Sequence, residues 1–276
     1  MTDTTSRAKQ SGARQYLSEL WGRRQFTWYL ATTNLKSQYA STSLGIVWWV
    51  LNPLLLTGVY FLVFGVIFAG GQRGNAAYLG YLMAGMFAFR FTSGVVSGGT
   101  STIVGNSQLM ANLRFPRLLL PISNVIESGI GFLVSIVAFF AIILPLTRDW
   151  PGWLLLWFIP IFLLQVTWNV GLSALTARIT VPHRDVAGLI PFLVRLWLYL
   201  SPIIWTLDRL EDAPEWVSTL VHLNPMFYFL SVYRTALLGW ELESRDLMVA
   251  AVCAVAIGVV GIASFVRYES RLIQEL

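Results

Sequence analysis

Cysteine, histidine and lysine are scarce in this chain of 276 residues. The single cysteine, Cys253, excludes an internal disulfide. The two histidines, His183 and His222, lie far apart in the sequence and form no metal-binding motif such as H-E-x-x-H. Neither lysine, Lys9 or Lys36, follows the glycine pattern of a Walker A loop. The sequence therefore predicts no metal or cofactor site, no catalytic residues and no ATP-hydrolysing site of that kind in this chain.

Charged residues are also few, at 12% of the chain. Soluble domains carry about 25%. Hydrophobic residues make up 56% of the chain and aromatic residues 14%, with 12 tryptophans, which is typical of a membrane protein with aromatic belts at both interfaces. The formal net charge is +5, but the basic residues lie beside apolar segments rather than on a soluble module. We therefore expect membrane lipids, and no nucleic acid, among its partners.

Long apolar runs predict an all-α polytopic membrane protein with six transmembrane helices. A helix needs about 20 apolar residues to cross the hydrocarbon core. We expect a disordered tail over 1–14, a membrane-embedded region over 45–266 and a short cytoplasmic tail over 267–276. The expected spans lie at about 45–69, 78–104, 118–146, 153–177, 189–205 and 247–266.

Residues 15–44 are polar and basic and lead directly into the first span. Apolar anchors such as Leu20 and Leu35 alternate with charges, which predicts an amphipathic helix lying in the cytoplasmic membrane interface. An ordinary juxtamembrane linker is the alternative. Because this region is polar, we expect no cleavable signal peptide. Within the first span, Asn52-Pro53 predicts a kink, since proline removes one helical hydrogen bond.

A second unusual segment is 216–238, WVSTLVHLNPMFYFLSVYRTALL, which is apolar but broken at Asn224-Pro225. Each half is too short to cross a bilayer. We therefore predict a pair of re-entrant helices on the exterior side, between spans 5 and 6. A seventh full span is the alternative, and the central break argues against it.

Six spans place both termini on one side of the membrane. If that side is cytoplasmic, it carries twelve Lys and Arg residues and five acids, whereas the exterior carries five Lys and Arg and eight acids. The positive-inside rule therefore predicts cytoplasmic termini in the plasma membrane. The twelve cytoplasmic cations are residues 7, 9, 14, 23, 24, 36, 114, 117, 178, 184, 267 and 271.

Three charged residues, Arg90, Glu127 and Arg195, lie within expected spans, where an unpaired charge is costly. Such residues normally face the bundle interior or water. They either line a polar path or serve a structural purpose, for example as an Arg90–Glu127 pair or as an arginine that reaches the interface. For Arg195 we favour the path, because its helical spacing places it on one face with Phe192 and Tyr199.

Aromatic residues allow the same two interpretations. Many membrane aromatics only pack or form interfacial belts. The alternative is that some line a conduit, because sugar rings stack on aromatic faces. The aromatic candidates for such a lining are Trp48, Phe61, Phe64, Phe192 and Tyr199, and Arg195 completes the set.

The stretch LATTNLKSQYASTSLGIVWWVLNPLL (30–55) resembles the start of permease subunits of type 2 ABC exporters, closest to the Wzm-like group that exports O-antigen, teichoic acid and galactan. That family typically shows Arg-Asp-Leu-Lys-x-Arg-Tyr, then Thr-x-Leu-Gly-x-x-Trp, then Pro-Leu. Here Thr33-Asn34 replaces Arg-Asp and Gln38 replaces the second Arg. The positions that carry the resemblance are Asn34, Leu35, Lys36, Tyr39, Thr42, Ser43, Leu44, Gly45, Trp48, Pro53 and Leu54.

Further stretches resemble this family in the same order over roughly 20–270: ANLRFPRLLLPI (111–122), RITVPHRDV (178–186), YLSPIIW (199–205) and LNPMFYFLSVYRTALLG (223–239). The first resembles a cytoplasmic turn whose coupling helix docks on the ATPase. The resemblance thus implies an ATPase-coupling role for residues in 105–117. These residues are Asn106, Gln108, Asn112, Arg114 and Phe115.

The resemblance implies a homodimer with two separate ATPase subunits, which bind ATP and Mg. It implies that spans 1 and 5 of both copies line a channel for a lipid-linked polysaccharide. Cytoplasmic cations are candidates for attracting the lipid diphosphate by charge-assisted hydrogen bonds, namely Arg23, Arg24, Lys36 and Arg184. The Arg-rich, Lys-poor composition is typical of an actinobacterium, in which the cargo would be cell-wall galactan. The alternatives are a type 2 exporter of drugs or small lipids, a membrane enzyme acting on lipid-linked sugars, and a structural membrane protein.

Overall fold

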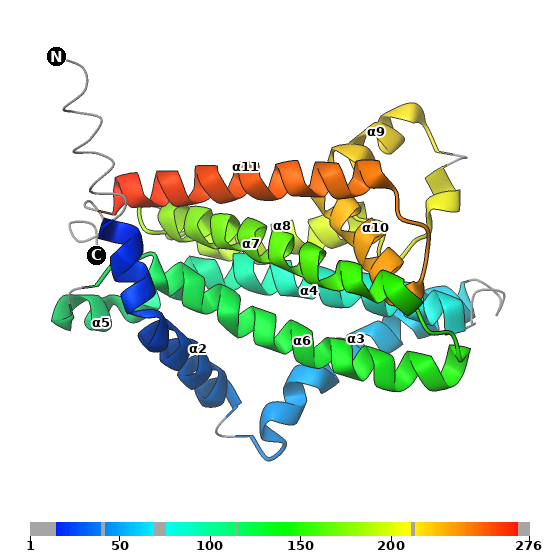
Figure 1. Cartoon of the computed structure of the whole chain (residues 1–276), viewed down its shortest axis with the longest axis horizontal. Helices are drawn as coiled ribbons and strands as arrows, with labels where there is room; N and C mark the ends of the chain where they lie inside the picture. Colours follow the sequence, from blue (N-terminus) through cyan, green and yellow to red (C-terminus); the bar gives the residue numbers. More distant parts are fainter. Residues whose placement is uncertain (1–14, 40–41, 69–75, 114, 211–212, 270–276) are drawn as a thin grey trace.

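The computed structural model describes residues 15–39, 42–68, 76–113, 115–210 and 213–269. The described residues form helices joined by turns and contain no strand, so the predicted all-α class is confirmed. The expected tail 1–14, part of the turn after span 1 (70–75) and the residues 270–276 lie outside the described ranges. Figure 1 shows a bundle of long, roughly parallel helices.

Five helical stretches are long and apolar enough to cross a membrane. Their bounds differ from the expected spans by only a few residues at most ends. They are Val50–Ile67 (within α3, Trp48–Tyr60, and the π-helical Phe61–Ile67), α4 (Ala76–Thr102), α6 (Leu119–Thr147), Gly152–Thr180 (a 3-10 turn and α7, Phe158–Thr180) and α11 (Ser244–Tyr268).

The fifth expected span, 189–205, is a shorter helix than the sequence predicts. α8 (Val186–Leu200) is apolar but has 15 residues, about 22 Å at 1.5 Å per residue. It ends at Ser201, whose backbone is extended (ψ 142°), because Pro202 disfavours a helical conformation in the residue before it. The expected helix over 201–205 was therefore wrong. These residues turn and bend instead.

The centre of the bundle is α4, which is the most buried of the five long stretches. Its Phe91 stacks on Phe132 of α6, with ring centroids 5.4 Å apart and planes within 9°. Phe132 in turn contacts Phe158 of α7 and Tyr233 of α10 (Pro225–Leu238). This aromatic stack joins four helices and fixes α4 and α6 side by side.

α7 and α11 approach each other at a glycine contact. A Cβ added at Gly171 would overlap the backbone carbonyl of Ile257, and one at Gly261 would overlap the backbone of Gly171. Small residues permit such close approach in membrane helices. This contact places α11 against the bundle along the opposite side from α6 (Figure 1).

The exterior end, as predicted from charge, holds α9 (Glu215–Leu223) and α10, which break at Asn224-Pro225 as expected. Asn224 caps α10 by accepting a hydrogen bond from Met226 N at 3.1 Å. It also accepts one from Trp197 Nε1 and donates one to Ser201 Oγ, both at 2.8 Å. One side chain thus ties the end of α8 to the start of α10.

Tyrosines and a buried arginine hold the irregular segment 201–205 in place. Tyr81 donates from its hydroxyl toward the carbonyls of Pro202 and Trp205, each at 2.9 Å. Arg234 of α10 is 3% exposed, donates to the Pro202 carbonyl and lies 3.5 Å from the Tyr81 ring centre. These contacts provide hydrogen bonds for backbone groups that no helix satisfies.

The amino-terminal region is two helices rather than the single helix expected over 15–44. Residues 15–22 are helical, Arg23 is in a turn, and α2 (Arg24–Tyr39) follows. α2 packs against α6 and buries Thr27, Ala31 and Leu35, which are spaced by four residues on one face. In Figure 1, α2 slants away from the end where α11 stops, and α3 continues toward the opposite end of the bundle.

Candidate functional site

A polar cavity of about 440 Å³ lies between α4 and α6, with contributions from α2 and α8. Most of its wall is built from two helical stripes that face each other. One runs along α4 and the other along α6, and each repeats every three or four residues, the spacing of one helix face. The lining residues are Leu35, Gln38, Phe87, Arg90, Phe91, Ser93, Gly94, Ser97, Gly98, Asn124, Glu127, Ser128, Gly131, Phe132, Ser135 and Val194.

Glycines on α4 allow the two stripes to come close. A Cβ added at Gly98 would overlap the side-chain oxygen of Asn124, and one at Gly94 would lie 3.4 Å from Ser128 Oγ. Asn124 is held firmly, because its amide nitrogen donates to the Val95 carbonyl at 2.8 Å and to Ser173 Oγ at 2.9 Å. The second half of α4 is rich in Gly and Ser, and such small residues let helices approach closely.

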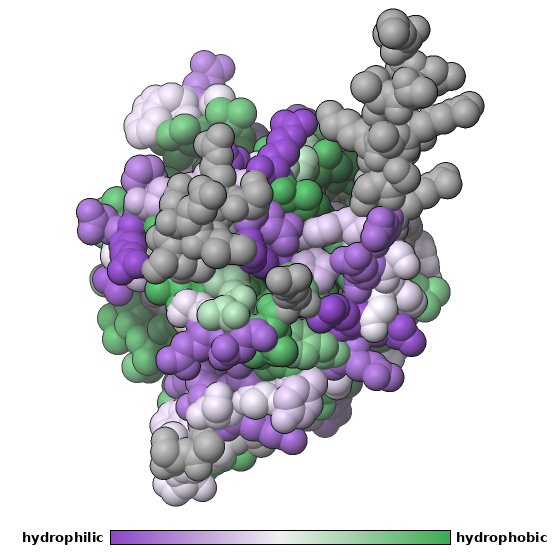
Figure 2. All heavy atoms as spheres, turned by 90° about the vertical axis from the view of Figure 1, so that its left-hand side faces the viewer, coloured by the Kyte–Doolittle hydropathy of each residue, from purple (hydrophilic) through white to green (hydrophobic). Residues whose placement is uncertain are grey.

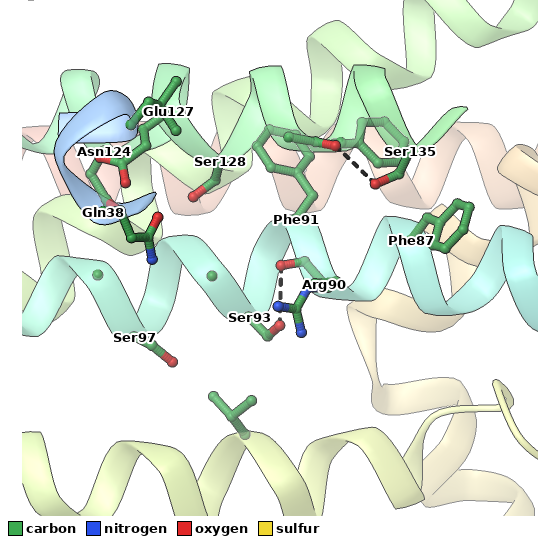
Figure 3. Close-up of a pocket in the computed structure, with 16 residues that line it drawn as sticks. Gln38, Phe87, Arg90, Phe91, Ser93, Ser97, Asn124, Glu127, Ser128 and Ser135 are labelled. Atoms are coloured by element: carbon green, nitrogen blue, oxygen red, sulfur yellow. Dashed lines mark hydrogen bonds between the residues drawn. The ribbon is translucent and has the colours of Figure 1, made fainter. Parts of the chain in front are cut away.

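Two of the three embedded charges, Arg90 and Glu127, line this cavity. They do not form the ion pair considered from the sequence, since the described residues include no salt bridge between them. Glu127 instead interacts with the side-chain amide of Asn34 on α2. Figure 3 shows Glu127, Gln38 and Asn124 together at one end of the cavity and Arg90 further along α4.

The three predicted lining residues of span 1 differ in what they pack against. Phe61 stacks on Tyr78 of α4, with ring centroids 6.2 Å apart, and so packs partly into the bundle. Phe64 contacts Tyr60 and Phe68 on its own helix. Trp48 is half-buried at the start of α3. The helix is π-helical from Phe61 to Ile67, a form that is often found at functional sites.

On α8 the three predicted lining residues share an open face. Phe192 is 66% exposed and Tyr199 50%, and Arg195 is exposed as well. The Tyr199 hydroxyl interacts with that of Tyr60 on α3, and Arg195 is close enough to act on Tyr60 electrostatically. Thus Arg195 and Tyr199 meet a residue of span 1 that the sequence did not single out, Tyr60.

The expected coupling residues lie at the end of the bundle where α11 stops. α5 (Ser107–Asn112) extends there beyond the long helices (Figure 1), and both Gln108 and Asn112 are exposed. Asn106 instead donates to the Thr102 carbonyl at 2.8 Å, and Phe115 packs on Phe26 with ring centroids 5.4 Å apart. Arg114 lies outside the described residues.

Three of the four cations expected to attract a lipid diphosphate lie in the amino-terminal region, and the fourth, Arg184, lies in the turn between α7 and α8. Arg23, Lys36 and Arg184 are exposed. Arg24 lies over the ring of Trp21, 5.3 Å from its centre, and donates to the Trp21 carbonyl. Figure 2, which views the molecule from this end, shows hydrophilic side chains interleaved with apolar ones over its surface.

A contact that the sequence did not predict closes this end of the bundle. The Tyr16 hydroxyl donates to the Glu269 carboxylate at 2.7 Å, and the other Glu269 oxygen accepts from the backbone N of Arg117, also at 2.7 Å. Burial, together with the hydrogen bond to Glu269, raises the pKa of Tyr16 above its usual value.

Among the described residues, no group of three or more His, Cys, Asp or Glu could hold a metal ion.

With this geometry in place, a family model described as ABC-2 type transporter matches residues 25–238. The chain belongs to the ABC-2 type transporter family. The match runs from α2 to the last residue of α10 and so includes the cavity, α5 and α8. The family predicted from the motifs of 30–55 is confirmed.

Curated relatives of this ABC-2 chain carry a more specific name. It is 29% identical over 254 residues to the O-antigen export system permease protein RfbA of Myxococcus xanthus, covering 92% of this chain and 95% of that one. It is 24% identical over 250 residues to a protein of the same name from Klebsiella pneumoniae, covering 90% and 93%. The similarity therefore extends over nearly the whole of both proteins.

Sequence reasoning about this ABC-2 chain identified Arg90 and Glu127 but missed the cavity that they share. The signal was present in part, because polar and small residues recur at helical spacing on both spans. The contributions of Asn34 and Gln38 depend on how α2 packs on α6. No local pattern in the sequence predicts that packing.

Proposed function

We propose that this chain is the permease subunit of an ABC exporter that moves a lipid-linked polysaccharide across the plasma membrane. The observation that carries the proposal is the near full-length similarity to permeases named for O-antigen export. The polar cavity supplies hydrophilic surface within the membrane region, as passage of a hydroxyl-rich polymer requires, and the open face of α8 adds aromatic rings and one arginine. A polyprenyl-diphosphate-linked cell-wall galactan is our specific candidate for the cargo.

The working unit in this proposal is a homodimer. Arg195 lies on an exposed face of α8, and a charge within a span normally faces a protein partner or water rather than lipid. A second copy placed against α3 and α8 would shield that charge and enclose a path between the copies. Trp48, Phe61, Phe64, Phe192, Arg195 and Tyr199 would line it, and α8 would complete a six-span arrangement.

Energy would come from two separate ATPase subunits that bind ATP and Mg. α5 is the natural docking element, because it extends from the end of the bundle where the first described helix and α11 meet. The excess of Lys and Arg in the segments at this end supports a cytoplasmic location for it. Arg23, Arg24, Lys36 and Arg184 would attract the lipid diphosphate from the same side.

Depletion of the chain in cells tests the proposal. Finished lipid-linked polymer should accumulate on the cytoplasmic face of the membrane while its synthesis continues. Loss of synthesis itself would contradict export and would favour a membrane enzyme acting on lipid-linked sugars.

The path assignment has a separate test. Trp48→Ala and Tyr199→Ala should lower export while the amount of folded protein stays the same, and Val137→Ala on the exposed face of α6 should leave export unchanged. If both lining variants export normally, these residues do not line the path.

A further inference from the structure

We infer that the cavity between α4 and α6 is a binding subsite for one uncharged sugar ring of the polymer. The inference rests on the proposed export function and adds a location and a ligand class to it. The cavity is walled by residues of one copy of the chain, and Val194 on one side belongs to α8, a helix of the proposed path. Its volume of about 440 Å³ is in the range of small-molecule pockets, about 300–1,000 Å³.

The walls offer hydrogen-bonding groups that are not otherwise engaged. In the part of the chain that the structure describes, no hydrogen bond is made by the hydroxyls of Ser97 and Ser128, the amide of Gln38 or the guanidinium of Arg90. Ser128 is half-buried, and Gln38, Arg90 and Ser97 are exposed, so all four side chains are accessible to a ligand that enters the cavity. A hydroxyl-rich ligand would satisfy all of them at once.

The arrangement of planar polar groups suits vicinal hydroxyls. Glu127, Gln38 and Asn124 gather at one end of the cavity (Figure 3). A carboxylate and two amides provide both acceptors and donors in fixed planes, so that adjacent hydroxyl groups of one ring can each find a partner. Asn34 helps to hold the Glu127 side chain in this cluster.

The charge of the lining favours a neutral ring over an anionic group. Arg90 is the one cation among the lining residues and Glu127 the one acid, so their formal charges cancel. A phosphate or a uronate near Gln38 would face the Glu127 carboxylate, and like charges at close range repel. The cavity therefore differs in chemistry from the basic surface around Arg23 and Arg24.

The floor of the cavity is rigid and apolar. Phe87, Phe91 and Phe132 are each at most 3% exposed, and Phe91 and Phe132 are stacked on each other. Above this floor the serine hydroxyls can rotate to donate or accept. Such a wall can hold sugars of different stereochemistry weakly and release each one, as a conduit requires.

Saturation-transfer NMR on the chain in lipid nanodiscs tests the subsite, with methyl α-galactopyranoside and methyl α-mannopyranoside as neutral probes and glycerol 3-phosphate as the anionic one. We expect saturation transfer to the neutral glycosides with the natural chain, and its loss in Ser128→Phe, which fills the cavity. The matched control, Val137→Phe, lies on the exposed face of the same helix and should keep the signal. Gln38→Leu, at an exposed position of α2, should weaken the signal without disturbing the fold.

Three results would overturn the inference: no transfer to either glycoside, equal transfer to the natural chain and Ser128→Phe, or stronger transfer to glycerol 3-phosphate. Export assays on the same variants separate this inference from the proposed function. If Ser128→Phe abolishes binding but export continues, the subsite is not on the route and the export function stands. If cells export polymer without the chain, the export function fails regardless of the binding result.

Discussion

The hydroxyl of Tyr16 donates a hydrogen bond of 2.7 Å to the carboxylate of Glu269, across 253 positions of sequence. Glu269 also accepts from the backbone N of Arg117, and the Arg117 guanidinium donates to the Glu269 carbonyl. Glu269, the first residue after α11, thus joins the first described helix to the segment that follows α5. Any movement of α5 toward an ATPase would change the geometry of these hydrogen bonds.

The first prediction concerns this junction. Tyr16→Phe and Glu269→Leu should each lower the free energy of unfolding by about 1–3 kcal/mol, because each leaves a partly buried polar group without its partner. The double variant should cost less than the sum of the two, as expected for residues in direct contact. Thermal unfolding of the purified protein measures all three. Glu19→Gln, at an exposed position of the first described helix, is the control, and strict additivity would contradict the contact.

A second prediction concerns the α7–α11 crossing. Gly171→Ala should destabilise the fold by about 1–3 kcal/mol, because the new methyl group overlaps the Ile257 carbonyl and forces the helices apart. Gly58→Ala in α3 is the matched control, since an added Cβ there meets nothing within 4 Å. The comparison is made by thermal unfolding in the same detergent. Equal stability of the two variants would show that the helices do not pack this closely.

The third prediction concerns Asn224. Asn224→Ala should lower the free energy of unfolding by about 2–3 kcal/mol, because Trp197, Ser201 and the α10 amino terminus all lose a hydrogen-bond partner. Asn224→Asp keeps the two accepted hydrogen bonds and loses only the donor to Ser201, so its cost should be smaller. If the two variants are equally stable, the acceptor role of Asn224 is wrong.

The fourth prediction concerns the docking of the ATPase. With Cys253 replaced by Ser, a cysteine at Gln108 should cross-link to a cysteine on the surface of the co-purified ATPase subunit, because Gln108 is exposed on α5. Glu241→Cys, exposed in the loop between α10 and α11, is the control. The products are read on a denaturing gel. Cross-linking from position 241 and not from 108 would reverse the assigned orientation.

Much of the fold could be predicted from the sequence, because membrane spans and helix breaks leave local signals. Asn224-Pro225 marked the break between α9 and α10. The end of α8 was missed, although Pro202 carried a signal for it. Contacts between distant segments could not be predicted, since the Tyr16–Glu269 hydrogen bond and the approach of Asn34 to Glu127 depend on tertiary packing.

The most direct test of export uses inside-out membrane vesicles that contain the chain, its ATPase and labelled lipid-linked polysaccharide on the outer surface. Addition of ATP should make the polymer resistant to an added glycosidase, because export carries it into the vesicle lumen. Vesicles that lack the chain should leave it fully digestible. If the polymer stays digestible with the complete complex and ATP, the chain does not export polysaccharide.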